Sequence, residues 1–194
     1  MTTREANGGD VRTPPPTIID RTTKETKVHV HLARSRAADA PEQAMHTGEP
    51  FLDHVLTTLA RYSELDLRVV ASGDLRHHVI EDVAIAVGTA VSRNVSDRIV
   101  RYGERTIPMD DALVQVALDL GGRPYYRGPL PSDLYDHWMR SFADHARATL
   151  HVRVLRGVDR HHIVEAAFKG LGFALRESLA DAPSPISTKG AVQW

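Results

Sequence analysis

The sequence predicts an internally duplicated fold that combines strands with helices. Hydrophobic residues recur at alternate positions in some segments and at helical spacing in others. When the chain is shifted by 84 positions, a set of glycine, histidine and glutamate residues falls on an identical set. Gly73, His77, His78, Glu81 and Gly88 fall on Gly157, His161, His162, Glu165 and Gly172. We infer a duplicated strand–turn–helix unit whose helix begins with His-His-x-x-Glu.

The first half predicts two strands and one helix before the helix that carries the first histidine motif. Residues 1–18 are polar and rich in glycine and proline, so we expect a flexible arm. Alternation over 27–32 predicts a half-buried strand, and the small, charged stretch 33–45 predicts a loop. Apolar residues at helical spacing predict a helix over 51–62, and a strand over 65–70 leads to the helix 77–95.

The second half predicts a similar series of elements. We interpret Tyr102-Gly103 as a turn, and the apolar segment 112–120 fits either a strand or a helix. The patterns then predict a helix over 133–146, a strand over 149–155 and an amphipathic helix over 161–179. We therefore expect one domain over 19–190, made of repeats at about 19–100 and 101–182, followed by a tail over 183–194.

Composition excludes several classes of protein. The 194 residues include no cysteine, which rules out disulfides and thiolate metal sites. A net charge of −1 argues against general nucleic-acid binding. No apolar run reaches the roughly 20 residues that span a bilayer, and the first residues lack the apolar core of a signal peptide. We expect a cytoplasmic protein that binds neither nucleic acid nor membranes.

The duplicated motif has the chemistry of a metal site. Imidazole and carboxylate groups are good ligands for divalent first-row metals. His77 and Glu81 are four residues apart, and His78 and Glu81 are three apart, so each pair meets on a helix. Adjacent histidines diverge by about 100° and should serve different ions. One turn supplies too few ligands, so we expect the two motifs to meet within a chain or across a subunit contact. The alternative for one histidine alone is a helix cap or a surface residue.

Other histidines have weaker patterns. His54 follows Asp53 near a helix start, where it is a candidate ligand, although Asp53 could instead act as a helix cap. His151 lies on the strand that leads to the second motif, as a candidate ligand or a partly buried polar residue. His29 and His31 alternate on one face of a strand, and we interpret them as solvent-exposed. The others have no partner at a useful spacing, and we interpret them as surface residues: His46, His137 and His145.

A group of cationic and polar residues near turns and ends is a candidate phosphate site. Each alone is typical of solvated surface, but together they suit a phosphate anion, because arginine offers paired donors and lysine a point charge. The group is Arg101, Arg123, Lys169, Ser187 and Lys189.

The motifs together resemble the imidazoleglycerol-phosphate dehydratase family, in order over about 19–190. The matching segments are Thr23-Lys24-Glu25-Thr26, 47–54, 73–75, 77–82, 108–110, 118–120, 122–124, 150–152, 161–166, Phe168-Lys169 and 187–190. The resemblance implies a duplicated α+β fold in which each half is a four-stranded sheet backed by two helices. It implies a 24-mer built from trimers, with active sites between subunits and two manganese(II) ions per site, and no organic cofactor.

The resemblance also implies roles for individual residues. The implied metal ligands are His54, His77, His78, Glu81, His151, His161, His162 and Glu165. Arg101, Arg123, Lys169, Ser187 and Lys189 match phosphate-binding positions, the last two in the tail. Glu25 matches a substrate-contacting acid and is a candidate for proton transfer; by itself it would be an exposed charge at a strand edge. We count Glu25, Glu81 and Glu165 as candidate catalytic residues.

The implied reaction is loss of water from imidazoleglycerol phosphate to give imidazoleacetol phosphate in histidine biosynthesis. Two rivals share the same residues. A dinuclear metallohydrolase would release inorganic phosphate from a small phosphate ester, and a metal-storing oligomer would need no phosphate site. A paralogue with an altered substrate also remains open, because Arg76 directly precedes the first histidine pair and Val79 follows it, unlike many family members.

Overall fold

The first half of the chain folds into a four-stranded sheet with two helices on one face. In this computed structural model, which describes residues 15–34 and 44–184, the sheet order is β1-β2-β4-β3. Neighbouring strands are antiparallel except β3 and β4, which are parallel. The strands are β1 (Thr17–Thr22), β2 (Thr26–Ala33), β3 (Met45–His46) and β4 (Asp66–Gly73), and the helices are α1 (Pro50–Ser63) and α2 (Arg76–Ser92).

The second half repeats this arrangement. Its sheet has the order β5-β6-β8-β7, again antiparallel except for the parallel pair β7 and β8. The strands are β5 (Tyr102–Met109), β6 (Ala112–Asp119), β7 (Tyr125–Arg127) and β8 (Thr149–Arg156), and the helices are α3 (Asp133–Ala146) and α4 (Arg160–Ser178). The predicted α+β fold with two similar halves is therefore confirmed.

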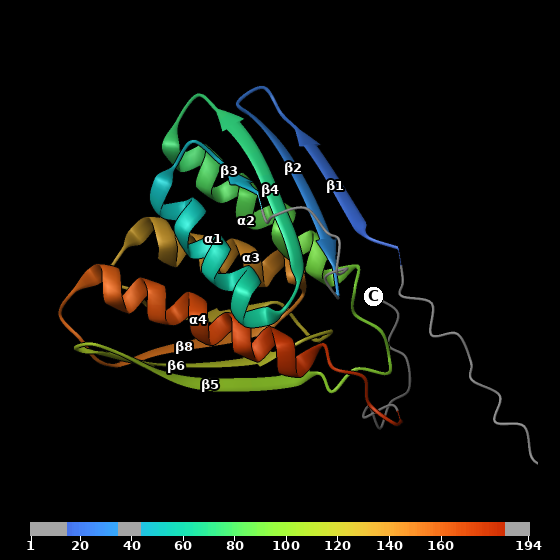
Figure 1. The fold of residues 1–194 in the computed structure, drawn as a ribbon, viewed down its shortest axis with the longest axis vertical. Helices are drawn as coiled ribbons and strands as arrows, with labels where there is room; N and C mark the ends of the chain where they lie inside the picture. Colours follow the sequence, from blue (N-terminus) through green and yellow to red (C-terminus); the bar gives the residue numbers. More distant parts are fainter. Residues whose placement is uncertain (1–14, 35–43, 185–194) are drawn as a thin grey trace, which may run out of the picture.

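The four helices lie between the two sheets (Figure 1). Each helix packs against a helix of the other half, α1 against α4 and α2 against α3, and α4 also packs closely on β5 and β6. Trp138 of α3 is fully buried, and its ring contacts Phe168 of α4 at a centroid distance of 4.6 Å. The helices thus share one core, and no helix within the described residues covers the outer face of either sheet.

The repeated glycines of the motif helices allow this close helix packing. A Cβ on Gly88 would lie 2.6 Å from the carbonyl oxygen of Phe142 on α3. A Cβ on Gly172 would lie 3.0 Å from the carbonyl oxygen of Leu59 on α1. The absent side chains therefore let each motif helix approach the backbone of its partner.

Several sequence predictions need correction. β1 begins at Thr17, so it takes the last two residues of the predicted arm, whose residues 1–14 lie outside the described chain. Tyr102-Gly103 is the start of strand β5 rather than a turn. The ambiguous segment 112–120 is strand β6. The two short parallel strands β3 and β7 were not predicted. The predicted loop ends in β3, and most of the predicted tail, residues 185–194, lies outside the described chain.

A β-bulge makes the two halves differ by one residue. In the pairing of β6 with β8, Leu113 pairs with Arg156 and Val114 with Val154, so Leu155 has no partner of its own. The corresponding pairing of β2 with β4 has no such shift. Helices α1 and α3 begin 83 positions apart, whereas α2 and α4 begin 84 apart, because in the second half the bulge lies between α3 and α4.

Among the helices in the described part of the chain, none is both long enough and apolar enough to cross a membrane.

Candidate metal centre

One cluster of possible metal ligands joins α1 to the start of α4. His54 Nε2 lies 3.0 Å from Glu165 Oε2, and His161 Nε2 lies 3.2 Å from the same oxygen. The rings of His54 and His161 are roughly parallel, with centroids 5.9 Å apart. One ligand atom from each of the three residues lies within 4.8 Å of the others. We call this group cluster A.

Glu165 in cluster A is held ready to bind a cation. The residue is only 7% exposed, and Lys169 Nζ lies 2.9 Å from its Oε1. Burial opposes ionisation, but contacts with His54 and Lys169 outweigh it and hold the pKa of the Glu165 carboxyl below its usual value. The carboxylate is therefore charged at neutral pH and can act as a ligand.

A second cluster of the same design joins α2 to α3. His77 Nε2 lies 3.4 Å from Glu81 Oε2, and His137 Nε2 lies 3.2 Å from Glu81 Oε1. The rings of His77 and His137 are also nearly parallel, with centroids 5.3 Å apart. These three residues form cluster B, and their ligand atoms again lie within 4.8 Å of one another.

His137 in cluster B corrects the interpretation of that histidine as a surface residue. Its side chain is 38% exposed, but its Nε2 atom is buried and has no hydrogen-bond partner. A signal was present: Asp53-His54 recurs as Asp136-His137 at an offset of 83 rather than 84. Shifting the chain by 84 positions, which aligns the histidine motifs, does not align these two pairs. The one-residue bulge at Leu155 lies between His137 and the second histidine motif and accounts for the difference.

The two motifs do not meet each other in the described chain. Each cluster takes its histidine–glutamate pair from one motif and its third ligand from a helix of the opposite half. The adjacent histidines have different partners, as predicted, because His77 and His161 belong to the clusters whereas His78 and His162 contact Asp74 and Asp111. His78 and His162 thus point away from clusters A and B.

His78 and His162 contact carboxylates instead. His78 Nδ1 lies 2.8 Å from Asp74 Oδ1 and 3.7 Å from Glu25 Oε2. His162 Nδ1 lies 2.8 Å from Asp111 Oδ1. These carboxylates raise the pKa of both imidazoles, and the hydrogen bond is the largest cause in each case.

His151 lies apart from both clusters. It is exposed on β8, at the uncovered face of the second sheet, with its ring 5.6 Å from that of Tyr125. A cavity of about 340 Å³ is lined there by Gln115, Ala117, Arg127, Gly128, His151, Val152 and Arg153. The described chain places no other implied metal ligand at this face.

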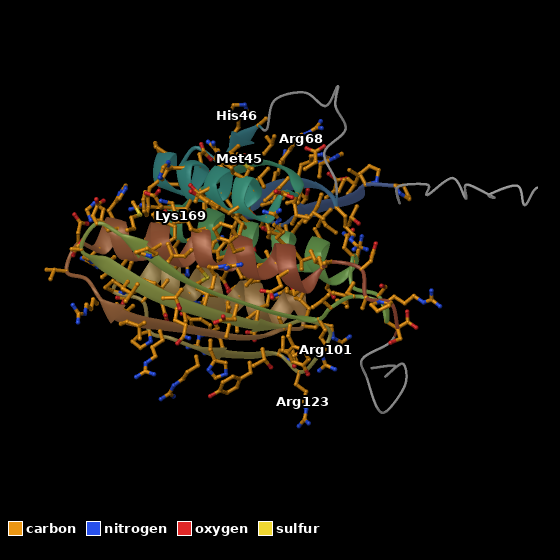
Figure 2. All side chains as sticks on the ribbon, turned by 60° about the horizontal axis from the view of Figure 1, so that its bottom comes forward. Met45, His46, Arg68, Arg101, Arg123 and Lys169 are labelled. Carbon is orange, nitrogen blue, oxygen red and sulfur yellow. The ribbon has the colours of Figure 1, made fainter. Side chains whose placement is uncertain are left out.

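The candidate phosphate residues are spread over the chain. Arg101 makes two contacts with the Asp119 carboxylate, at 2.6 and 3.1 Å, and this partner raises the pKa of its guanidinium. Arg101 and Arg123 lie near one another at one end of the molecule, whereas Lys169 lies elsewhere, beside cluster A (Figure 2). Ser187 and Lys189 lie outside the described residues.

Glu25 lies in the tight turn between β1 and β2. Its carbonyl oxygen accepts a hydrogen bond from Asp74 N at 3.1 Å, which ties this turn to the end of β4. Its side chain is 56% exposed and faces His78. The candidate acid is therefore accessible and lies beside a candidate metal ligand.

Together the fold and these clusters define a duplicated α+β protein with paired imidazole–carboxylate sites suited to divalent first-row metals. Comparison with known proteins identifies the family. The family model for imidazoleglycerol-phosphate dehydratase matches residues 47–175. A relative of that name from Pyrobaculum calidifontis is 43% identical over 189 residues, covering 89% of this chain and 98% of the relative. One from Salinispora arenicola is 44% identical over 200 residues, covering 90% and 97%.

Solved structures of imidazoleglycerol-phosphate dehydratases support the same family. The chain is similar to the dehydratase of Pyrococcus furiosus in complex with (S)-C348, with a TM-score of 0.80, 38% identity and coverage of 90% of this chain and 100% of that one. The Staphylococcus aureus enzyme gives a TM-score of 0.74 at 29% identity, with coverage of 87% and 100%. The chain belongs to the imidazoleglycerol-phosphate dehydratase family, and it is an enzyme of the lyase class.

Proposed function

We propose that this chain removes water from imidazoleglycerol phosphate to give imidazoleacetol phosphate, as a cytoplasmic step of histidine biosynthesis that depends on bound divalent metal ions. The observation that carries the metal dependence is the pair of clusters A and B. Each brings two imidazoles and a carboxylate together in a chain of this family. This donor set suits divalent first-row metals in general, and on the family resemblance we propose two manganese(II) ions per active site.

The proposed ligands exceed what one chain gathers in clusters A and B. They are His54, His77, His78, Glu81, His151, His161, His162 and Glu165, together with His137, which completes cluster B. Three of them lie outside the clusters, which supports active sites completed by a neighbouring subunit. Exposed apolar residues support the same arrangement, since Ile18, Val70, Tyr125 and Leu155 are each at least 40% exposed. We propose a 24-mer built from trimers.

The chemical difficulty is a carbon-bound proton that is acidic only if the imidazole ring of the substrate accepts charge. A bound divalent ion would supply Lewis-acid stabilisation of that charge. Glu25 would move the proton, because its carboxylate is exposed and faces His78. Glu81 and Glu165 are fixed by their histidine neighbours, so they would hold the reacting centre in place.

The phosphate group would be bound by Arg101, Arg123, Lys169, Ser187 and Lys189. Two of these cations are already positioned by carboxylates, since Arg101 contacts Asp119 and Lys169 contacts Glu165. Positioned donors fix the pose of the substrate and reduce the entropy that must be lost on reaching the transition state. Because Arg101 and Lys169 lie apart within one chain, the proposed phosphate site also needs a neighbouring subunit.

The test is an assay of the purified protein with imidazoleglycerol phosphate and manganese(II), with a chelated sample beside it. We expect imidazoleacetol phosphate to form only with metal. Glu81→Gln and Glu165→Gln should each lower turnover by at least about tenfold. Glu64→Gln is the matched control, because Glu64 contacts only the exposed Arg176 in the described chain and should not affect turnover.

Other outcomes would contradict the proposed reaction, its metal dependence or the proposed assembly. Release of inorganic phosphate without the dehydrated product would instead show a metallohydrolase. Turnover that survives complete chelation would contradict the proposed metal dependence. Sedimentation analysis with and without manganese(II) measures the assembly, and a monomer under both conditions would contradict the proposed 24-mer.

A further inference from the structure

The second histidine of each motif makes the same contact with a carboxylate. His78 Nδ1 lies 2.8 Å from Asp74 Oδ1, and His162 Nδ1 lies 2.8 Å from Asp111 Oδ1. An ionised carboxylate only accepts hydrogen bonds, so the proton between the two groups belongs to Nδ1. In the neutral ring this leaves the lone pair on Nε2, the form in which an imidazole binds a metal through that atom.

The two carboxylates come from different parts of the fold. Asp74 precedes His78 by four residues, at the end of β4. The position 84 residues after Asp74 is Val158, which is 90% exposed and has no polar side chain. Asp111 takes this role from the turn between β5 and β6, 51 residues before His162. The same contact therefore exists in both halves although the repeat did not preserve the residue that makes it.

Asp111 is held in place by backbone groups as well as by His162. Its Oδ2 accepts hydrogen bonds from the backbone N–H groups of Val158 at 2.6 Å and Asp159 at 3.1 Å. This leaves Oδ1 for His162. The carboxylate thus joins the β5–β6 turn to the start of α4 and fixes the orientation of the imidazole at the same time.

We propose that Asp74 and Asp111 are positioning residues for metal binding, which hold His78 and His162 with Nδ1 protonated and the lone pair on Nε2. His162 Nε2 lies 3.6 Å from Asp110 Oδ2, beyond hydrogen-bond distance. The inference rests on the proposed role of these histidines as metal ligands. A hydrogen bond from the second ring nitrogen to a carboxylate sets the orientation and raises the basicity of a ligating histidine, and its loss typically costs about 10–100-fold in metal affinity.

Asp111→Asn separates this role from a purely structural one. The amide oxygen can still accept from the N–H groups of Val158 and Asp159, while the amide nitrogen then faces Nδ1 and donates to it. That contact moves the ring proton to Nε2 and blocks the metal-binding atom. The measurement is calorimetric titration of the full-length, chelated protein with manganese(II), together with its metal-free thermal midpoint.

We expect Asp111→Asn to weaken manganese(II) binding by about 10–100-fold, with the metal-free midpoint within about 3 °C of wild type. Asp74→Asn should weaken binding in the same range. Asp144→Asn is the control, because Asp144 is exposed on α3 and the charge change is the same. In a His162→Ala background, Asp111→Asn should cause no further loss of affinity, because the aspartate acts through that ring.

Other outcomes would overturn the inference. These are manganese(II) affinity of Asp111→Asn within twofold of wild type, or an equal loss of affinity in the His162→Ala background. A drop in the metal-free midpoint as large as that of Asp111→Ala would show that Asp111 acts only by anchoring the turn. Failure of the proposed metal role is distinguishable, because the wild-type protein itself would then not bind manganese(II). Failure of the proposed reaction is distinguishable too, because imidazoleacetol phosphate would then not form although manganese(II) still binds and still depends on Asp111.

Discussion

Asp82 should be one of the most important residues for the stability of the first half. It is 7% exposed on α2, directly after Glu81. Its Oδ1 accepts from Arg21 Nε at 3.0 Å and Nη2 at 2.9 Å, and its Oδ2 accepts from the buried Thr26 hydroxyl. The network ties β1 and β2 to the helix that carries the first histidine motif.

The expected cost of Asp82→Ala follows from these contacts. The buried hydrogen bond from Thr26 to a charged group contributes about 1.5–3 kcal/mol. The Arg21 side chain is 36% exposed, so solvent screening limits its ion pair to about 0.5–1 kcal/mol. A total of about 2–4 kcal/mol lowers the thermal midpoint of a chain of this size by about 5–15 °C. Alanine itself fits this helix position, since Ala166 is the fully buried counterpart in α4.

The assay is thermal unfolding of the chelated protein followed by circular dichroism. Asp82→Asn should lose less stability than Asp82→Ala, because the amide oxygen can still accept from Thr26. Asp144→Asn serves as the control. In the double variant Arg21→Ala/Asp82→Ala, the losses should fall short of additivity by about 0.5–1 kcal/mol. A midpoint for Asp82→Ala within 2 °C of wild type would refute the reasoning about the network.

Three further predictions concern the site. Glu25→Gln should lower turnover by about 10²–10⁴-fold without changing the bound manganese, measured by elemental analysis; wild-type turnover would remove Glu25 from proton transfer. His137→Ala should weaken manganese binding, as His54→Ala should, because both histidines complete clusters of the same design; calorimetry that finds no effect for His137 alone would break the proposed equivalence. The lowered pKa of Glu165 means that its contribution to stability is complete above about pH 4.3, the unfolded value, and is lost as the pH falls through the lower folded value. Urea midpoints of the chelated wild type and Glu165→Gln should therefore converge on acidification, and a constant difference would contradict this.

The helices were predictable because their patterns are local. The predicted helix 133–146 coincides with α3, and the bounds of the other three differ by at most three residues. Strand β5 was missed because only two of its residues, Gly103 and Ile107, are buried, so it shows no apolar alternation. Its pairing with β6 defines it as a strand. Strands β3 and β7 have two and three residues, which is too short for any period to show.

The candidate site was predictable only in part for a similar reason. The histidine–glutamate spacing on one helix is a local property, and it gave four of the six residues in clusters A and B. His54 was recognised from its segment, whereas the matching pair Asp136-His137 was missed because it recurs at an offset of 83 rather than 84. Asp111 reaches His162 across 51 residues, and only the folded turn brings them together. Contacts of this kind have no signature in residue order.

Because α1 pairs with α4 and α2 with α3, neither half of the chain possesses an intact ligand trio. A polypeptide with the length of one repeat would have to form a dimer to bury its helices. Ligand clusters like A and B would then form at the dimer interface. Any ion bound there would bridge the two halves like a removable crosslink. If the backbone were cut between residues 93 and 101, the two fragments should therefore bind each other more tightly as the metal concentration rises.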